Sequence, residues 1–356
     1  MRFFGDNASW NRPVTDFGEA PGMGDYPRRL TAAGKLTPAF SAYSVPILDR
    51  AQATTTAKVF QPSWAAAQLT SALPAGGTIP WHPAWANSVP PGNDRTLIIV
   101  DRTTGEVWEL WIVGTPGLDC LTWANVFGGL YVPGGYKLSV AAVSYWRDCR
   151  TAVDDGRVWL RGCGLHKLAM IVRAQEVLDG AIRHALPLTV PNPMFGPMAN
   201  PPIGGAGAGA GTTRGFYMRP ATRLEHADPA TLGLGGVTTT ATDAQRARSV
   251  PSGMRFAIRA TDADISAWLD SRGYTGALRQ TARIFAVALR DYGAIVAETG
   301  GMSSGIHGIE TDGLADPATR YLWAQAGITG DGTDYPLRDL LAGLVSADRL
   351  FVVAQP

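Results

Sequence analysis

The chain has 356 residues, of which 46% are hydrophobic and 17% are charged, and its formal net charge is +1. A chain of this length can bury a substantial core in one large or two ordinary domains, and so small a net charge gives no electrostatic reason to expect nucleic acid or an anionic membrane as a partner. The 42 Gly and 25 Pro residues favour a loop-rich, mainly β architecture over a helical bundle.

The start of the chain and its cysteines bear on location and redox chemistry. Residues 1–13 lack a basic stretch followed by an apolar run of signal-peptide length, and no stretch reaches the roughly 18 apolar residues of a membrane helix. We therefore expect neither export by the general route nor membrane insertion. Cys149 and Cys163 could pair across a hairpin and leave Cys120 free, or all three could be thiols. Because no residues have metal-site spacing, we expect no metal and no cofactor.

Residues 1–54 contain many aromatic side chains without a sustained period, and they are too apolar for a free disordered tail. An extended N-terminal arm that docks on a surface explains them. That surface could be the chain's own body or a neighbouring subunit. We expect residues 55–356 to form one β domain, interrupted by a Pro- and Gly-rich loop insertion at about 191–250.

Residues 97–113 give the clearest β-hairpin signal, with two apolar strands joined by a short turn. In the second strand Glu109 and Trp111 share one face, and Trp108 lies on the other. A carboxylate beside an indole can line a sugar-binding groove. We therefore take Trp111, Glu109, Trp108 and Asp101 as candidate ligand-binding residues, with a solvated strand face as the alternative.

The segment 162–191 is expected to lie at the centre of the core. Its first apolar run is Leu168–Val172, and its second, Ile182–Val190, carries His184. The pattern predicts a strand or short helix, a turn, and a buried strand. Glu176 lies between the two runs, eight residues before the histidine.

Glu176, His184 and Glu298 are the candidate catalytic residues. A histidine with a carboxylate in hydrogen-bond reach can act as an acid–base pair, and glycosidases need two carboxylates flanking the sugar bond. The alternative is a core histidine held by internal hydrogen bonds. No ExDxxE-like arrangement lies on one strand and no Gly-x-Ser-x-Gly elbow is present. Both absences count against an enzyme; if the chain is one, we expect a polysaccharide hydrolase or lyase.

The last third of the chain is more regular. Its patterns predict a strand at 253–259, helices at 261–272 and 278–292, a strand at 294–298 with 308–312 as its hairpin partner, a short helix at 339–345 and a strand at 350–353. We expect two or three peripheral helices in this third of a mainly β chain.

Four stretches carry a resemblance in combination. They are WHPAW and DRTLIIVDRTTGEVWELW within 81–111, the GL–M(I/V)–E–G–I–HAL pattern of 164–186, SGMRFAIR at 252–259, and ALRDYGAIVAETGG at 288–301. Together they resemble a group of actinobacterial extracellular β-sandwich proteins and actinobacteriophage minor tail proteins, over roughly residues 75–355 without the loop insertion. The resemblance implies a jelly-roll-like β-sandwich of the lectin or glucanase kind.

The resemblance also implies a function. We expect a virion structural protein of a phage tail tip or baseplate, made in the host cytoplasm, that contacts host cell-envelope glycans. Its partners would be other phage tail proteins and copies of itself in a homo-oligomer, a trimer being one option. Two alternatives stay open: a glycan-cleaving enzyme on the same fold, and a purely structural scaffold subunit.

Overall fold

The computed structural model describes residues 3–60, 77–92, 94–114, 131–132, 135–150, 160–194, 216–225, 247–300, 305–330 and 339–354. These residues form a mainly β structure with a smaller number of helices. The strands lie in one six-stranded sheet and two four-stranded sheets, and each sheet mixes parallel and antiparallel pairs. The prediction of a mainly β chain is confirmed.

The strands are β1 (Lys35–Ala39), β2 (Ile47–Asp49), β3 (Thr55–Phe60), β4 (Thr78–Trp81), β5 (Leu97–Val100), β6 (Val107–Trp111), β7 (Tyr131–Val132), β8 (Gly135–Ser139), β9 (Ala142–Trp146), β10 (Leu186–Val190), β11 (Arg255–Ile258), β12 (Ala294–Thr299), β13 (Ile306–Glu310) and β14 (Leu350–Val352). The α-helices are α1 (Tyr26–Ala33), α3 (Ala174–Leu178), α5 (Asp262–Arg272), α6 (Gly276–Asp291) and α7 (Pro317–Gln325).

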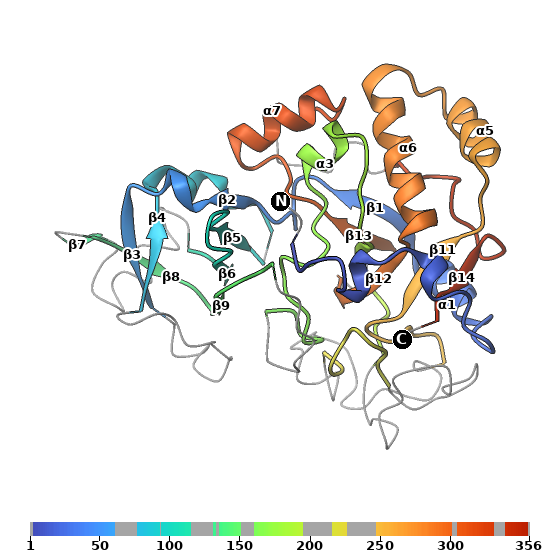
Figure 1. Ribbon diagram of the computed structural model, residues 1–356, viewed down its shortest axis with the longest axis horizontal. Helices are drawn as coiled ribbons and strands as arrows, with labels where there is room; N and C mark the ends of the chain where they lie inside the picture. Colours follow the sequence, from blue (N-terminus) through green and yellow to red (C-terminus); the bar gives the residue numbers. More distant parts are fainter. Residues whose placement is uncertain are drawn as a thin grey trace.

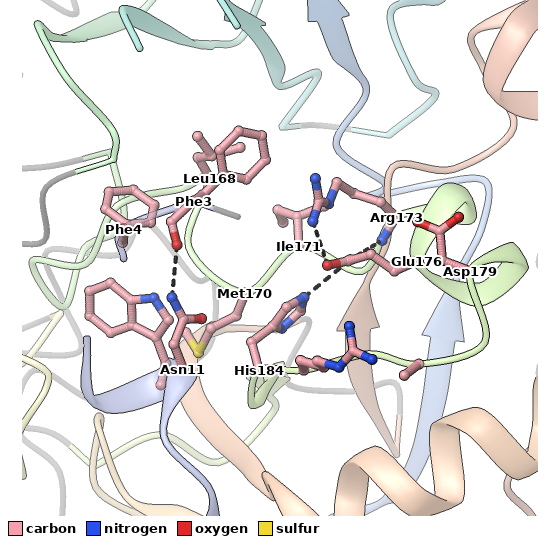
Figure 2. Close-up of a pocket in the computed structure, with 13 residues that line it drawn as sticks. Phe3, Phe4, Asn11, Leu168, Met170, Ile171, Arg173, Glu176, Asp179 and His184 are labelled. Carbon is pink, nitrogen blue, oxygen red and sulfur yellow. Dashed lines mark hydrogen bonds and ion pairs between the residues drawn. The ribbon is translucent and has the colours of Figure 1, made fainter. Parts of the chain in front are cut away.

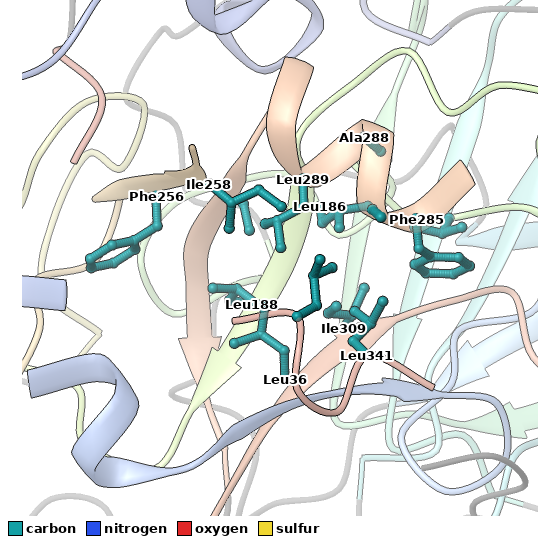
Figure 3. Packing of buried hydrophobic residues seen from close by; sticks show 14 of the residues in the cluster. Leu36, Leu186, Leu188, Phe256, Ile258, Phe285, Ala288, Leu289, Ile309 and Leu341 are labelled. Atoms are coloured by element: carbon teal, nitrogen blue, oxygen red, sulfur yellow. The ribbon is translucent and has the colours of Figure 1, made fainter. Parts of the chain in front are cut away.

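The six-stranded sheet, in the order β1-β13-β10-β12-β11-β14, carries the main core. Alternate residues of a strand point to opposite faces, so Leu186 and Leu188 of β10 reach the same side. On that side they meet the apolar stripe of α6, including Phe285 and Leu289, as Figure 3 shows. The other face of the sheet presents Ile295 and its neighbours to a second cluster.

The two four-stranded sheets, β2-β5-β6-β9 and β4-β3-β8-β7, form the other end of the molecule (Figure 1). They share a third apolar cluster that includes Ile79, Ile99 and Trp108. The opposite face of β5 and β6 contributes Ile98 and Val107 to the second cluster, which connects this end to the six-stranded sheet. We call this end, residues 47–60, 77–114 and 131–146 as far as they are described, the small-sheet lobe.

The jelly-roll arrangement is not confirmed. A jelly roll is a double sheet of antiparallel strands. Here β1 pairs with β13 in parallel, and β10 pairs with β12 in parallel. The long segments between these strands allow such crossovers, whereas the expectation assumed hairpin connections.

The N-terminal residues dock on the chain's own body. Phe3, Phe4 and Trp10 are buried in the second cluster, and β1 forms an edge of the six-stranded sheet. Residues 3–54 therefore complete the core instead of extending from it. Of the two docking surfaces considered for the N-terminal residues, the structure therefore shows the chain's own body.

Several local predictions hold, and others fail for identifiable reasons. The 97–113 hairpin is present as antiparallel β5 and β6. Helix α5 is capped at its N-terminus by Thr261, whose side chain accepts from the backbone N–H of Asp264, and at its C-terminus by Gly273 with φ +66°. Residues 308–312 were wrongly expected to pair with the strand at 294–298, because β10 inserts between β12 and β13. The segment 339–345 forms turns, not a helix.

Segment 162–191 is less regular than expected. Its first apolar run makes turns and a single bridge from Val172 to Thr311, and its second becomes a strand only from Leu186.

In the 191–250 insertion, Phe216 and Met218 are buried in the main core, while 195–215 and 226–246 lie outside the described residues. Within the part of the chain that the structure describes, no helix is long and apolar enough to cross a membrane.

Candidate functional site

The predicted sugar-facing carboxylate, Glu109, lies inside the molecule. Its side chain is 1% exposed, and its Oε1 accepts a hydrogen bond of 2.8 Å from the backbone N–H of Leu168. His166 Nδ1 lies 3.8 Å from the same oxygen. Strand parity did place Glu109 on the face of Trp111, but that face packs against the 160–171 segment instead of facing solvent. Glu109 therefore anchors this segment and lines no groove.

Of the other three ligand-binding candidates, Trp108 lines an open hollow formed by described residues. Trp111 is half-buried, and its Nε1 lies 3.4 Å from Asp94 Oδ1. Asp101 accepts from the backbone N–H groups of Thr103 and Thr104 and pairs with Arg50 at 3.3 Å. Asp101 is therefore a turn-forming carboxylate that positions the arginine.

The hollow lies where β3 and β4 face the start of β6 and has a volume of about 500 Å³. Its lining combines threonine hydroxyls, one cation, one carboxylate and one indole; the lining residues are Arg50, Ala53, Thr54, Thr55, Thr56, Thr78, Ile79, Pro80, Glu106 and Trp108. The Trp108 indole N–H is buried, and no hydrogen-bond partner for it exists among the described residues. Glu106 Oε1 accepts from the Tyr145 hydroxyl at 2.6 Å, and burial and this carboxylate raise the pKa of Tyr145 to about 12.

The predicted catalytic pair, Glu176 and His184, is brought together but is fully engaged (Figure 2). Glu176 is the third residue of α3, and its Oε2 accepts from His184 Nε2 at 3.2 Å and from the backbone N–H of Arg173 at 3.1 Å. Its Oε1 accepts from the Arg173 guanidinium. Burial alone would raise the pKa of Glu176, but His184 and Arg173 outweigh it and lower the pKa to about 2.

Both ring nitrogens of His184 are engaged within the protein. Nδ1 lies 2.9 Å from the carbonyl oxygen of Ala185, and Nε2 lies 3.2 Å from Glu176 Oε2. A histidine and a carboxylate paired in this way hold the local structure.

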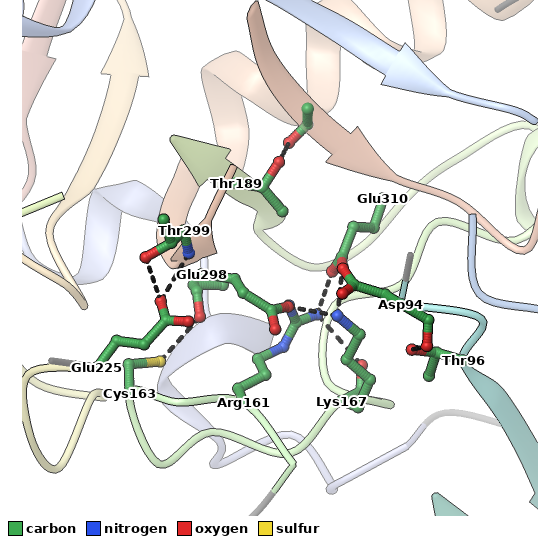
Figure 4. Close-up of polar contacts among 12 residues, drawn as sticks. Asp94, Thr96, Arg161, Cys163, Lys167, Thr189, Glu225, Glu298, Thr299 and Glu310 are labelled. Carbon is green, nitrogen blue, oxygen red and sulfur yellow. Dashed lines mark hydrogen bonds and ion pairs between the residues drawn. The ribbon is translucent and has the colours of Figure 1, made fainter. Parts of the chain in front are cut away.

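Glu298, the third catalytic candidate, belongs to a buried ion cluster that the sequence did not predict (Figure 4). We call Arg161, Lys167, Glu298 and Glu310 the four-charge cluster. Glu298 Oε2 accepts from Arg161 Nη1 at 3.0 Å and from Lys167 Nζ, and Glu310 Oε1 accepts from Lys167 Nζ at 2.7 Å. Arg161 also pairs with Glu310. The cluster therefore attaches the 160–168 segment to β12 and β13.

The two carboxylates of the four-charge cluster titrate differently. Burial, together with the Glu310 charge, outweighs Lys167 and Arg161 and raises the pKa of Glu298 to about 7. For Glu310, burial is outweighed by Arg161 and Lys167, which hold its pKa below the usual value. Because both carboxylates are bonded to both cations, the arrangement supports a structural role more than acid–base chemistry.

Asp312 is a buried carboxylate at the end of β13. It accepts from Trp323 Nε1 at 2.7 Å and from the backbone N–H of Ala174 at 3.2 Å, which ties β13 to α7 and α3. Burial outweighs these hydrogen bonds and raises the pKa of Asp312 to about 7. The folded protein therefore holds a proton on Asp312 at pH values where the unfolded chain has lost it.

We expect this proton to make stability depend on pH. Between about pH 4 and pH 7 the folded state binds more protons at Asp312 than the unfolded state, so the free energy of unfolding falls as pH rises. Asp312→Asn should make the difference in the free energy of unfolding between about pH 4.5 and about pH 7.5 smaller by about 1–3 kcal/mol. Urea unfolding curves at the two pH values measure this difference. The exposed Asp339→Asn control should keep the wild-type slope, and an unchanged slope in Asp312→Asn would contradict the assignment.

The remaining reactive groups are enclosed. Cys149 and Cys163 are free, buried thiols, and burial raises the pKa of each to about 12. Cys120 lies outside the described residues. Over the described ranges, no group of three or more His, Cys, Asp or Glu side chains is arranged to hold a metal ion.

Comparison of the chain with protein-family models, with curated proteins and with solved structures found no significant match. A proposal of function therefore draws on the geometry above and on the resemblance described under Sequence analysis. The sequence did contain Glu298, Glu310 and Asp312 as scattered carboxylates, but Arg161 and Lys167 carried no signal. Their partners lie more than 130 residues away in the chain, so only the fold brings them together.

Proposed function

We propose that this chain is a virion structural protein of a phage tail tip or baseplate that contacts host cell-envelope glycans through the hollow of the small-sheet lobe. The observation that carries the glycan part is the lining of that hollow. Threonine hydroxyls, Arg50, Glu106 and the unpartnered Trp108 indole N–H offer the mixture of polar groups and aromatic surface that sugar hydroxyls and sugar faces need.

The virion part of the proposal rests on the resemblance of the stretches within 81–111, 164–186, 252–259 and 288–301 to actinobacteriophage minor tail proteins. The first of these stretches includes β5 and β6, the two central strands of the β2-β5-β6-β9 sheet in the small-sheet lobe. Because Phe3, Phe4 and Trp10 are buried in the chain's own body, we place contacts with other tail proteins or with further copies of the chain on other surfaces. A jelly-roll relationship is not needed for the proposal.

A binding role is favoured over glycan cleavage. Among the residues that the structure describes, one carboxylate, Glu106, lines the hollow, whereas glycoside hydrolysis normally uses two. Glu176 and His184 lie elsewhere and are saturated by internal hydrogen bonds. Binding at a single hollow would be weak, and many copies in one virion would multiply it.

The hollow can be tested with matched arginine variants. Arg50 lines the hollow, while Arg102 on the same lobe pairs with Asp49 at 3.0 Å and does not line it. We expect Arg50→Ala to weaken retention on actinobacterial cell-wall polysaccharide about tenfold, because a charge-assisted hydrogen bond is worth roughly 1.5–3 kcal/mol. Arg102→Ala should bind like wild type. Equal retention of all three proteins would exclude this hollow as the glycan site.

A further inference from the structure

The charged side chains around the hollow of the small-sheet lobe narrow the class of glycan that it can bind. This inference rests on the proposed glycan contact and adds to it the charge of the sugar. Arg50 and Glu106 are the charged residues of the lining, as far as the structure describes it. Each of the two already has partners within the protein.

The charge of Arg50 is balanced by a carboxylate beside the hollow. Arg50 Nε lies 3.3 Å from Asp101 Oδ2, and the side chains are 50% and 10% exposed. Burial would raise the pKa of Asp101, but backbone N–H groups of the following turn and the Arg50 charge outweigh it and hold the pKa below its usual value. Asp101 is therefore ionised at neutral pH, and an anion that enters the hollow meets a guanidinium whose charge is already balanced.

The carboxylate of Glu106 is engaged at both oxygens. Oε1 accepts from the Tyr145 hydroxyl at 2.6 Å, and Oε2 accepts from the Thr104 hydroxyl at 3.1 Å. A cationic sugar would have to displace these hydroxyl donors, and an anionic sugar would be repelled by the carboxylate.

The other polar side chains of the lining are hydroxyls. Thr54 and Thr56 are exposed, and Thr55 and Thr78 are half-buried. A threonine hydroxyl can both donate and accept, which matches the hydroxyls of an uncharged sugar. The Trp108 ring adds apolar surface for the face of a sugar, a contact that needs no charge.

We propose that the hollow selects uncharged glycan chains and discriminates against anionic ones. An ionised group that leaves water for a protein site needs a counter-charge to replace its hydration. In the described part of the lining the one cation, Arg50, is already paired with Asp101. Together with Glu106, these side chains sum to one negative charge, so an anion meets net repulsion.

Matched forms of one glycan test the proposal on the full chain. The probes are uncharged arabinogalactan from actinobacterial cell walls, the same preparation with its primary hydroxyls oxidised to carboxylates, and the oxidised preparation after methyl esterification, which removes the charge. We expect oxidation to weaken retention of the protein at least about fivefold and esterification to restore most of it.

The outcomes separate this proposal from the glycan contact on which it rests. Equal or tighter retention on the oxidised form would overturn the charge selection and leave the glycan contact standing. Retention on the esterified form as poor as on the oxidised form would also overturn it, because the lost hydroxyls and not the charge would then explain the effect. If none of the three forms retains the protein, the glycan contact itself fails.

A variant of the lining tests the cause of the selection. Glu106→Gln keeps the size of the side chain and an oxygen that can accept from Tyr145, but removes the negative charge. The ratio of retention on native and oxidised glycan should fall about threefold at low salt, the effect of one charge about 6 Å away in water. Glu19→Gln, which makes the same change in a pair with Arg259 outside the lining, should keep the wild-type ratio. An unchanged ratio in Glu106→Gln would contradict the proposal.

Discussion

Lys167→Met is expected to lower the free energy of unfolding by about 3–5 kcal/mol. The Lys167 side chain is 4% exposed, and it lies between the carboxylates of Glu298 and Glu310. Without the Lys167 charge, the carboxylates of Glu298 and Glu310 both pair with Arg161 alone. One buried negative charge then has neither a cation nor water to stabilise it. Denaturant unfolding followed by tryptophan fluorescence measures the difference.

Lys35→Met is the matched control for this prediction. Lys35 pairs with Asp339 at 3.3 Å, but the two side chains are 65% and 55% exposed. Exposed pairs contribute about 0–1 kcal/mol, so the control should unfold nearly as wild type does. The double variant Lys167→Met/Glu310→Gln should recover part of the loss because it restores charge balance. Similar effects of Lys167→Met and Lys35→Met would show that the four-charge cluster does not stabilise the fold.

Glu176→Gln is expected to lower the free energy of unfolding by about 2–4 kcal/mol near neutral pH. The substitution removes the charge that pairs with the Arg173 guanidinium and weakens the contact with the His184 ring. The folded-state pKa of Glu176 is about 2, below its usual value of 4.5, so the stabilisation is present above about pH 4.5 and is lost as pH falls towards 2. The difference between wild type and Glu176→Gln should therefore shrink over that range.

Asp179→Asn makes the same carboxylate-to-amide change on an exposed residue at the end of α3, and we expect its effect to stay within about 0.5 kcal/mol. Circular dichroism melts of both variants at several pH values give the comparison. If Glu176→Gln is as stable as Asp179→Asn near neutral pH, the carboxylate is not a structural anchor, and its use in chemistry must be reconsidered.

Sequence patterns predicted the local elements better than the connections between them. The 97–113 hairpin and helix α5 are specified by turn and capping residues within a few positions, so the sequence contains their signals. The order β13-β10-β12 depends on packing between segments over 100 residues apart, and no local pattern encodes it. The jelly roll is not confirmed because strand order of this kind cannot be predicted from local patterns.

In the candidate site, too, local relations between residues were predictable from the sequence and long-range contacts were not. Glu176 and His184 lie eight residues apart in the chain, and the structure places them within hydrogen-bonding distance. Glu109 and Trp111 share a face as strand alternation requires, but alternation cannot tell which face is covered. Here the 160–171 segment covers it through the Leu168 contact. The hollow was missed because its threonines lie on or directly before β3 and β4, for which no strand was predicted.

The central claim is that the chain binds cell-envelope glycans through the hollow without cleaving them. The most direct measurement incubates wild-type and Arg50→Ala protein with actinobacterial cell-wall polysaccharide and reads both retained protein and released reducing ends. We predict that wild type is retained, that Arg50→Ala is retained about tenfold less well, and that reducing ends do not increase with time. A steady release of reducing ends, or no retention of the wild-type protein, would contradict the claim.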